Sequence, residues 1–215
     1  MTIKTKDHCF TLDIDLYHFL VLLGDKMGKS IVNEIATPDF SIIVRPSERQ
    51  SFKKEGDYNI FVVKDSGEEV RLDMPHRGAK MFYILTLLCQ KAVGGLPNMY
   101  FKNKSAAAAI KALFDKLYRW GGEEWVDNCA NNKHYLSTYR THSKDAVRDN
   151  IHLDHVQRYW CGFEDERRTI GRRQLQLRRI RILSDRIFFE DADNSQVTFE
   201  QIIEQLPPFE DLFGF

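Results

Sequence analysis

Hydrophobic and polar positions alternate most clearly in two short segments in the first half of the chain. Residues 59–64 are mainly apolar, residues 69–73 alternate between charged and apolar side chains, and the turn residues 65–68 lie between them. Gly67 tolerates the positive φ that a tight turn requires. Because two strand-like segments joined by such a turn pair with each other, the pattern predicts a β-hairpin over residues 59–73.

Helical spacing of apolar residues follows this hairpin. It runs through residues 77–92 and predicts a helix there, and the glycines at 94–95 are expected to end this helix. It returns in residues 105–118, with Ser105 as the expected N-cap and the glycines at 121–122 as the expected end. The predicted buried positions of these two helices are Met81, Leu85, Leu88, Ala92, Ile110, Leu113, Phe114 and Leu117.

Further helices are predicted in the second half of the chain. Residues 132–149 form a long amphipathic segment, and residues 151–160 are also compatible with a helix. Thr198 and Gln201 have the spacing of a capping box, which opens a short helix that the prolines at 207–208 end. Residues 119–131 are interpreted as a long connection.

Three segments give weaker signals. Residues 39–45 are predicted to form a short strand that Pro46 closes. Residues 11–35 begin with alternation and continue with an apolar run that fits either a helix or a buried strand. Residues 167–189 fit a bulged strand and a helix about equally, because the phase of their alternation changes within the segment.

Composition narrows the class of protein. The chain has 215 residues, of which 43% are hydrophobic and 29% are charged, as in ordinary globular proteins. This balance excludes disordered and collagen-like chains, and no apolar run has the length of about 20 residues that a membrane span needs. The four cysteines are far apart and no secretory signal is recognised, so we expect a cytoplasmic protein with reduced thiols and no membrane contact.

Charge is distributed unevenly along the chain, although the net charge is zero. Residues 167–181 carry seven arginines and no acid, whereas residues 187–215 carry seven acids and no lysine or arginine. Guanidinium groups bind phosphate through paired hydrogen bonds, so the first block suits a nucleic acid. Alternatively, the acidic block neutralises the basic block within the fold. Both interpretations, nucleic-acid binding and internal neutralisation, hold if an acidic tail covers a nucleic-acid site until DNA displaces it.

The predicted helix over residues 132–149 has a second concentration of positive charge. One face is basic and hydroxyl-bearing, and another is apolar except for Ser143. Such a helix is typical of groove binding, although an ordinary amphipathic surface helix has the same pattern and Asp145 and Asp149 flank the basic stripe. The basic face comprises Lys133, Ser137, Arg140, Lys144 and Arg148, and the apolar face comprises Leu136, Tyr139, Ala146 and Val147.

The order of these elements resembles a winged helix-turn-helix domain, in particular the output domain of response regulators, in which strands precede three helices. The resemblance covers residues 57–190. It implies that residues 132–149 are the recognition helix and that residues 167–189 are the wing. The resemblance further implies that the basic helix face meets the groove and that Arg172, Arg173, Arg178 and Arg179 contact the DNA backbone. Residues 119–131 and 151–160 depart from the pattern.

Two other groups of residues have some features of a ligand-binding site, one for a nucleotide phosphate and one for zinc. Residues 24–30 resemble a phosphate-binding loop, but only three residues separate the glycines, so a plain turn is favoured. Cysteine and histidine side chains between 129 and 161 have metal-binding chemistry but lack zinc spacings, so packing or surface roles are favoured. We therefore expect no metal, no cofactor and no recognisable catalytic site. The residues weighed for zinc are Cys129, His134, His152, His155 and Cys161.

The end of the sequence combines aromatic and acidic residues, which either dock on the chain's own core, where arginine–aromatic stacking is available, or bind a partner protein. The residues considered for such a partner are Phe209, Leu212, Phe213 and Phe215.

The sequence thus predicts an α+β protein with a winged-helix-like core, consisting of a β-hairpin, three helices and an arginine-rich, wing-like segment. Three parts are expected: an N-terminal α/β extension of unknown role over residues 1–56, the winged-helix-like domain over residues 57–190, and an acidic C-terminal segment over residues 191–215. The expected function is binding of double-stranded DNA in transcriptional regulation or another DNA transaction. The alternative is a non-catalytic protein–protein adaptor that uses opposed basic and acidic surfaces.

Overall fold

A computed structural model describes residues 2–4, 9–11, 38–47, 58–170, 172–193 and 195–213, with only the backbone at 2–4, 9–11, Lys133 and Phe213. The chain is a mixed α+β protein, as predicted. Strands β1 (Thr2–Lys4) and β2 (Cys9–Thr11) pair antiparallel with each other. The phosphate-loop-like segment 24–30 and most of the predicted extension 1–56 lie outside the described residues.

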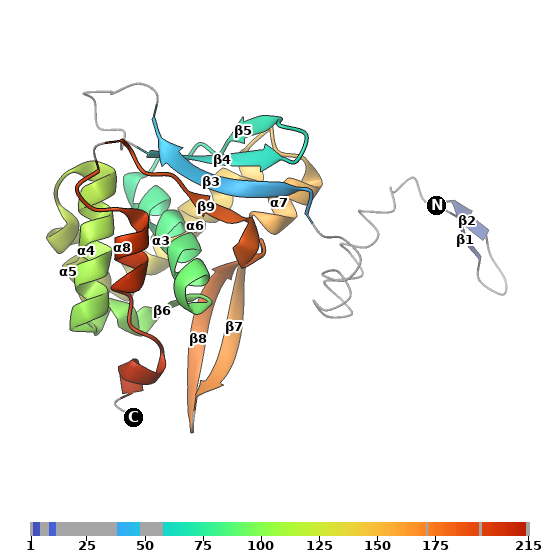
Figure 1. Cartoon of the computed structure of the whole chain (residues 1–215). Coiled ribbons are helices and arrows are strands. Elements are labelled where there is room, and N and C mark those ends of the chain that lie inside the picture. Colours follow the sequence, from blue (N-terminus) through green and yellow to red (C-terminus); the bar gives the residue numbers. More distant parts are fainter. Residues whose placement is uncertain are drawn as a thin grey trace.

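The first larger sheet has the strand order β5-β4-β3-β9 (Figure 1). The predicted hairpin is confirmed, because β4 (Tyr58–Lys64) pairs antiparallel with β5 (Glu69–Arg71), and Gly67 in the turn has φ +89°. The predicted strand at 39–45 is β3 (Phe40–Pro46), and it pairs antiparallel with β4. Its other neighbour, β9 (Ile187–Phe189), runs parallel to it, so the end of the segment expected to form the wing belongs to this sheet instead.

Helix α3 (Arg77–Val93) lies in the centre of the core, and all its residues from Met81 to Gln90 are buried. A helix that is buried on every side must satisfy its polar side chains internally. Gln90 does so by donating from Nε2 to the Ile182 carbonyl oxygen at 2.6 Å and accepting from the Ile180 N–H at 2.8 Å. The helix ends at Gly94, whose φ of +89° is the left-handed C-cap that the sequence predicted.

The helices after α3 match the sequence in part. Helix α4 (Lys104–Tyr118) and helix α6 (Lys133–Asp149) confirm the predicted 105–118 and 132–149 helices. The predicted cap Ser105 is wrong, because the side chain of Asn103 accepts the hydrogen bond from the Ala106 N–H at 3.0 Å.

Two further helices lie in the segments that depart from the winged-helix pattern. The presumed connection 119–131 contains helix α5 (Gly122–Asn131), with Gly121 at its N-cap rather than at the end of the preceding helix. Helix α7 (His155–Trp160) occupies the second half of the 151–160 segment and begins with a capping box at Asp154.

The second sheet settles the strand-or-helix question at 167–189 in favour of strands. Strands β7 (Phe163–Ile170) and β8 (Arg173–Ile180) form an antiparallel hairpin. The short strand β6 (Leu96–Pro97) pairs with β8, which gives the order β6-β8-β7. Figure 1 shows the far end of this hairpin extending beyond the helices.

The C-terminal segment returns to the core. The 3-10 turn at Ser184–Arg186 precedes β9, and the predicted capping box at Thr198 is confirmed at the start of α8 (Phe199–Glu204). A last 3-10 turn spans Glu210–Phe213. None of the helices in the described ranges combines the length and apolarity that crossing a bilayer requires.

Candidate nucleic-acid interface

Helix α6 packs against α3 through the face that the sequence predicted to be apolar. Leu136 and Val147 are buried there, and Tyr139 lies so close to α3 that a Cβ atom on Gly78 would be 2.2 Å from its ring. Ser143 interrupts the apolar stripe, but its buried hydroxyl group has hydrogen-bond partners. It donates either to the Ala79 carbonyl oxygen at 2.9 Å or to the Tyr139 carbonyl oxygen at 2.7 Å. The inner face of α6 is thus fixed.

The opposite side of α6 carries part of the predicted basic face. Ser137, Lys144 and Arg148 are exposed, and the side chain of Lys133 lies outside the description. The Arg148 side chain is 68% exposed and forms ion pairs with Asp145 and Asp149 at 2.9 and 2.7 Å. Exposed pairs of this kind contribute about 0–1 kcal/mol, so a phosphate group can replace the carboxylates at little cost.

Arg140 does not share this exposed face, which corrects the sequence prediction. Its side chain is only 26% exposed, its Nη2 atom donates to Asp165 at 2.8 Å, and its guanidinium group lies over the Phe163 ring at 5.9 Å. Both partners are on β7, so Arg140 connects α6 to the hairpin. Its role in the structure is to hold the two elements together.

The second correction concerns the inner arginines of the hairpin. The β7–β8 register places Glu164 opposite Arg179 and Asp165 opposite Arg178. Arg179 pairs with Glu166 at 2.6 Å, and Arg178 donates to the side chain of Asn98. Both arginine side chains are thus partly buried and have partners within the fold, and acids of β7 itself neutralise part of the arginine block.

Electrostatics within the hairpin agree with this assignment. Burial lowers the pKa of Arg178, and the nearby charge of Arg140 lowers it further. Burial opposes ionisation of Glu166, but the hydrogen bond and charge of Arg179 and the charge of Arg168 outweigh it and lower the pKa of this carboxyl group. The Nε atoms of Arg140, Arg178 and Arg179 are shielded from solvent. These groups form the interior of the hairpin base.

The outer end of the hairpin differs from its base. Arg167, Arg172 and Arg173 are exposed; Arg172 lies in the turn between β7 and β8, and Arg173 is the first residue of β8. Closer to the core, Arg181 donates to the Tyr159 carbonyl oxygen at 3.2 Å and stacks on the Tyr159 ring. The cationic surface of the hairpin is thus concentrated at its tip.

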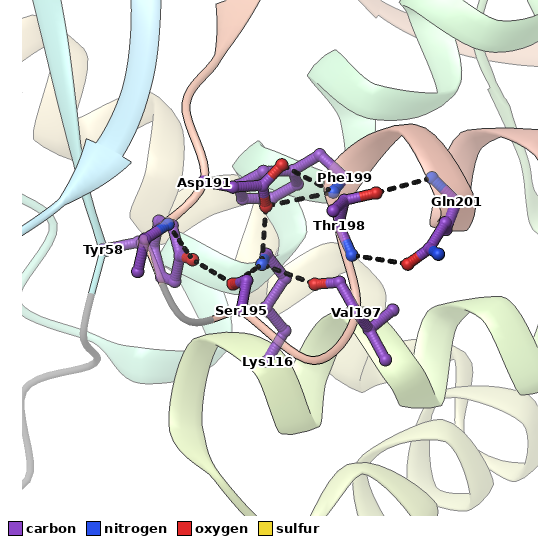
Figure 2. A network of polar contacts seen from close by, with 9 residues as sticks. Tyr58, Lys116, Asp191, Ser195, Val197, Thr198, Phe199 and Gln201 are labelled. Carbon is purple, nitrogen blue, oxygen red and sulfur yellow. Dashed lines mark hydrogen bonds and ion pairs between the residues drawn. The ribbon is translucent and has the colours of Figure 1, made fainter.

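The acidic C-terminal block has a structural role at its beginning, which Figure 2 shows. The Lys116 side chain is only 5% exposed and pairs with Asp191 at 2.6 Å. It also donates to the Ser195 hydroxyl and to the Val197 carbonyl oxygen, and lies over the rings of Tyr58 and Phe199. This network, which the sequence did not suggest, attaches the 191–199 segment to α4 and β4.

The last described residues dock on the core next to the hairpin. Phe209 is 4% exposed and lies against Tyr100. Of the two alternatives for this residue, docking on the chain's own core therefore applies, and not exposure to a partner protein. The Arg168 guanidinium group stacks on Phe209 at 5.5 Å, which confirms the expected arginine–aromatic contact. Leu212 is half-buried, and the side chains of Phe213 and Phe215 lie outside the described residues.

The residues weighed for zinc do not form a cluster. Cys129 and Cys161 are buried as free thiols, and burial raises the pKa of Cys129 to about 12. Within the described residues, no three histidine, cysteine, aspartate or glutamate side chains are placed to hold a metal ion.

Comparisons with protein-family models, with curated proteins and with solved structures found no match to this chain.

Proposed function

We propose that this protein binds double-stranded DNA, in transcriptional regulation or another DNA transaction, and that helix α6 and the β7–β8 hairpin form its winged-helix-like binding surface. The observation that carries the proposal is the placement of two exposed basic elements on one scaffold. Helix α6 presents Ser137, Lys144 and Arg148, and the hairpin tip presents Arg172 and Arg173. The Arg140–Asp165 ion pair joins the two elements.

The order of elements supports the proposal. The chain runs from α3 through β6 to α4, and then from α6 to the β7–β8 hairpin. Because β6 pairs with β8, the hairpin is attached to the helices as part of a three-stranded sheet rather than as a free loop. A projecting hairpin with this support suits contact with a DNA backbone beside a helix in the major groove. Helices α5 and α7 are additions to the simple pattern.

The exposure of the eight predicted contact residues whose side chains are described supports a division into two groups. Five are accessible to a polyanion, and three stabilise the base of the hairpin. The accessible group is Ser137, Lys144, Arg148, Arg172 and Arg173, and the stabilising group is Arg140, Arg178 and Arg179. Only the four cationic residues of the first group, Lys144, Arg148, Arg172 and Arg173, are expected to contribute to the salt dependence of binding, because each phosphate that a lysine or arginine neutralises releases a condensed counterion.

Fluorescence anisotropy with a labelled 30-base-pair duplex over a series of salt concentrations tests the proposal. We expect affinity to fall steeply with salt, and the R172A/R173A variant to reduce the slope of log K against log salt by about two. The matched control is R71A/R186A, which removes two positive charges away from the hairpin, one on β5 and one in the 3-10 turn before β9. The proposal fails if the wild type does not bind at low salt, or if both double variants have the same slope.

Helix α6 is tested by a matched pair of single variants. We expect K144A to weaken DNA binding by about three- to tenfold without changing stability, because the Lys144 side chain is exposed. R140A is expected to lower the free energy of unfolding by about 1 kcal/mol, since it removes the ion pair between α6 and β7. Urea unfolding and anisotropy on the same samples separate the two effects.

A further inference from the structure

The turn between α4 and α5 exposes a large aromatic side chain. Trp120 is 71% exposed, although tryptophan is usually among the more buried residues. It lines a surface depression of about 680 Å³ between the end of α4 and the start of α5. A single exposed apolar residue needs no explanation, but an exposed indole at the edge of a depression has the form of an interface anchor.

The position of Trp120 is fixed by contacts of its backbone. Arg77 of α3 donates from Nη2 to the Trp120 carbonyl oxygen at 2.7 Å, and its guanidinium group lies over the rings of Phe114 and Tyr118 at 4.5 and 4.4 Å. On the other side of the turn, the Gly122 N–H donates to Asp115 at 3.0 Å. Because the backbone of the turn is already ordered, it loses little additional conformational entropy when a partner binds.

The charge of the depression indicates what kind of group Trp120 contacts. Two basic and four acidic side chains line it, which gives a net charge of −2. Lys111 pairs with Asp115 at 2.9 Å, whereas Glu123, Glu124 and Asp127 make no ion pair within the described part of the chain. The N-terminus of α5 contributes only about half a positive charge, so the surface remains negative. The acidic residues would repel a phosphate backbone, and they favour a cation.

We infer that this depression is a docking surface for a basic segment of a partner protein. An arginine or lysine side chain of the partner stacks on the Trp120 indole and pairs with Glu123 or Glu124. The indole face is the strongest aromatic site for a cation, and the neighbouring carboxylates supply the second interaction. This inference is independent of DNA binding, because α4 and α5 contribute none of the proposed DNA contacts.

Isothermal titration of the full chain with the peptide Gly-Arg-Gly-Arg-Gly-Arg-Gly tests the inference. We expect the peptide to bind with an affinity that falls as the salt concentration rises. The W120A and E123Q/E124Q variants should each lower this affinity by at least about tenfold. I151A is the matched control, because Ile151 is 82% exposed on another surface, and it should bind like the wild type. Circular dichroism confirms that each variant is folded, and DNA anisotropy of W120A should equal that of the wild type.

Three results would overturn the inference. The first is no binding of the arginine peptide by the wild type at millimolar concentration. The second is equal binding by the wild type and W120A. The third is self-association of the wild type in sedimentation experiments, if both W120A and R172S/R173S abolish it. The occupant of the depression would then be the hairpin of a second copy of this chain rather than a separate partner. A loss of DNA binding alone would contradict the proposed function and leave this inference intact.

Discussion

At the scale of single residues, arginines that are alike in the sequence have opposite roles in the structure. Arg172 and Arg173 lie at an exposed hairpin tip, whereas Arg179, six positions further on, is paired with Glu166. The difference depends on the β7–β8 register, which places the three acids of β7 (Glu164, Asp165 and Glu166) opposite residues 177–179 at the base of the hairpin and none of them near its tip. The sequence alone does not fix that register, because its alternation changes phase within the segment.

Replacement of Glu166 by glutamine tests the pairing at the hairpin base. The pKa of Glu166 is lowered, so its stabilising contribution is complete above the ordinary value of 4.5 and is lost as the pH falls through the lowered pKa. We expect E166Q to lower the free energy of unfolding by about 1 kcal/mol at pH 7 and by much less at pH 3. Urea unfolding at both pH values measures this difference. E204Q, which changes an exposed carboxyl group on α8, should show no such pH-dependent difference.

A second prediction at this scale concerns the buried Lys116 ammonium group. K116M removes the partner of Asp191 and two further hydrogen bonds, so we expect a loss of about 2–3 kcal/mol in the free energy of unfolding. K111M is the matched control on the same helix, because Lys111 is 46% exposed and its pair with Asp115 is a surface pair. Thermal unfolding of the two variants compares them directly. Equal melting temperatures would show that the Lys116 network does not stabilise the C-terminal segment.

At the scale of elements, local periodicity was sufficient where a helix or hairpin is amphipathic. The β4–β5 hairpin and helices α3, α4 and α6 were predicted within a few residues, since each buries a regular set of apolar side chains. Helix α5 was missed because Gly121 and Gly122 have the pattern of a helix end, whereas Gly121 caps the next helix. Strands β7 and β8 were undecided because the alternation changes phase there and the pairing of β8 with β6 is a tertiary contact.

The candidate site was predicted less completely than the fold. Exposure of Ser137, Lys144 and Arg148 follows from the 3.6-residue period of α6, so the sequence was sufficient there. The inward turn of Arg140 depends on Asp165 and Phe163 of a strand that comes 23 or more residues later. Trp120 gave no signal because its exposure depends on the α4–α5 turn, which was interpreted as an irregular connection.

At the scale of the whole molecule, the opposed charge blocks do not simply neutralise each other. Acids of β7 compensate the inner arginines of the hairpin, and Asp191 at the start of the acidic block pairs with Lys116 of α4. The later acids Glu210 and Asp211 follow Phe209, which docks on Arg168 of the hairpin. The C-terminal segment therefore brings negative charge close to the hairpin that we propose to contact DNA.

Removing that charge tests whether the end of the chain opposes DNA binding. We expect E210Q/D211N to tighten binding by about two- to fivefold at low salt, because two charges within about a Debye length of the hairpin repel phosphate, and to have little effect at high salt, where they are screened. The fold should be unaffected, since both residues are exposed and Phe209 remains docked. The matched control E200Q/E204Q removes two charges from α8. Anisotropy curves for E210Q/D211N that coincide with those of the control at every salt concentration would show that the C-terminal acids do not act on the hairpin.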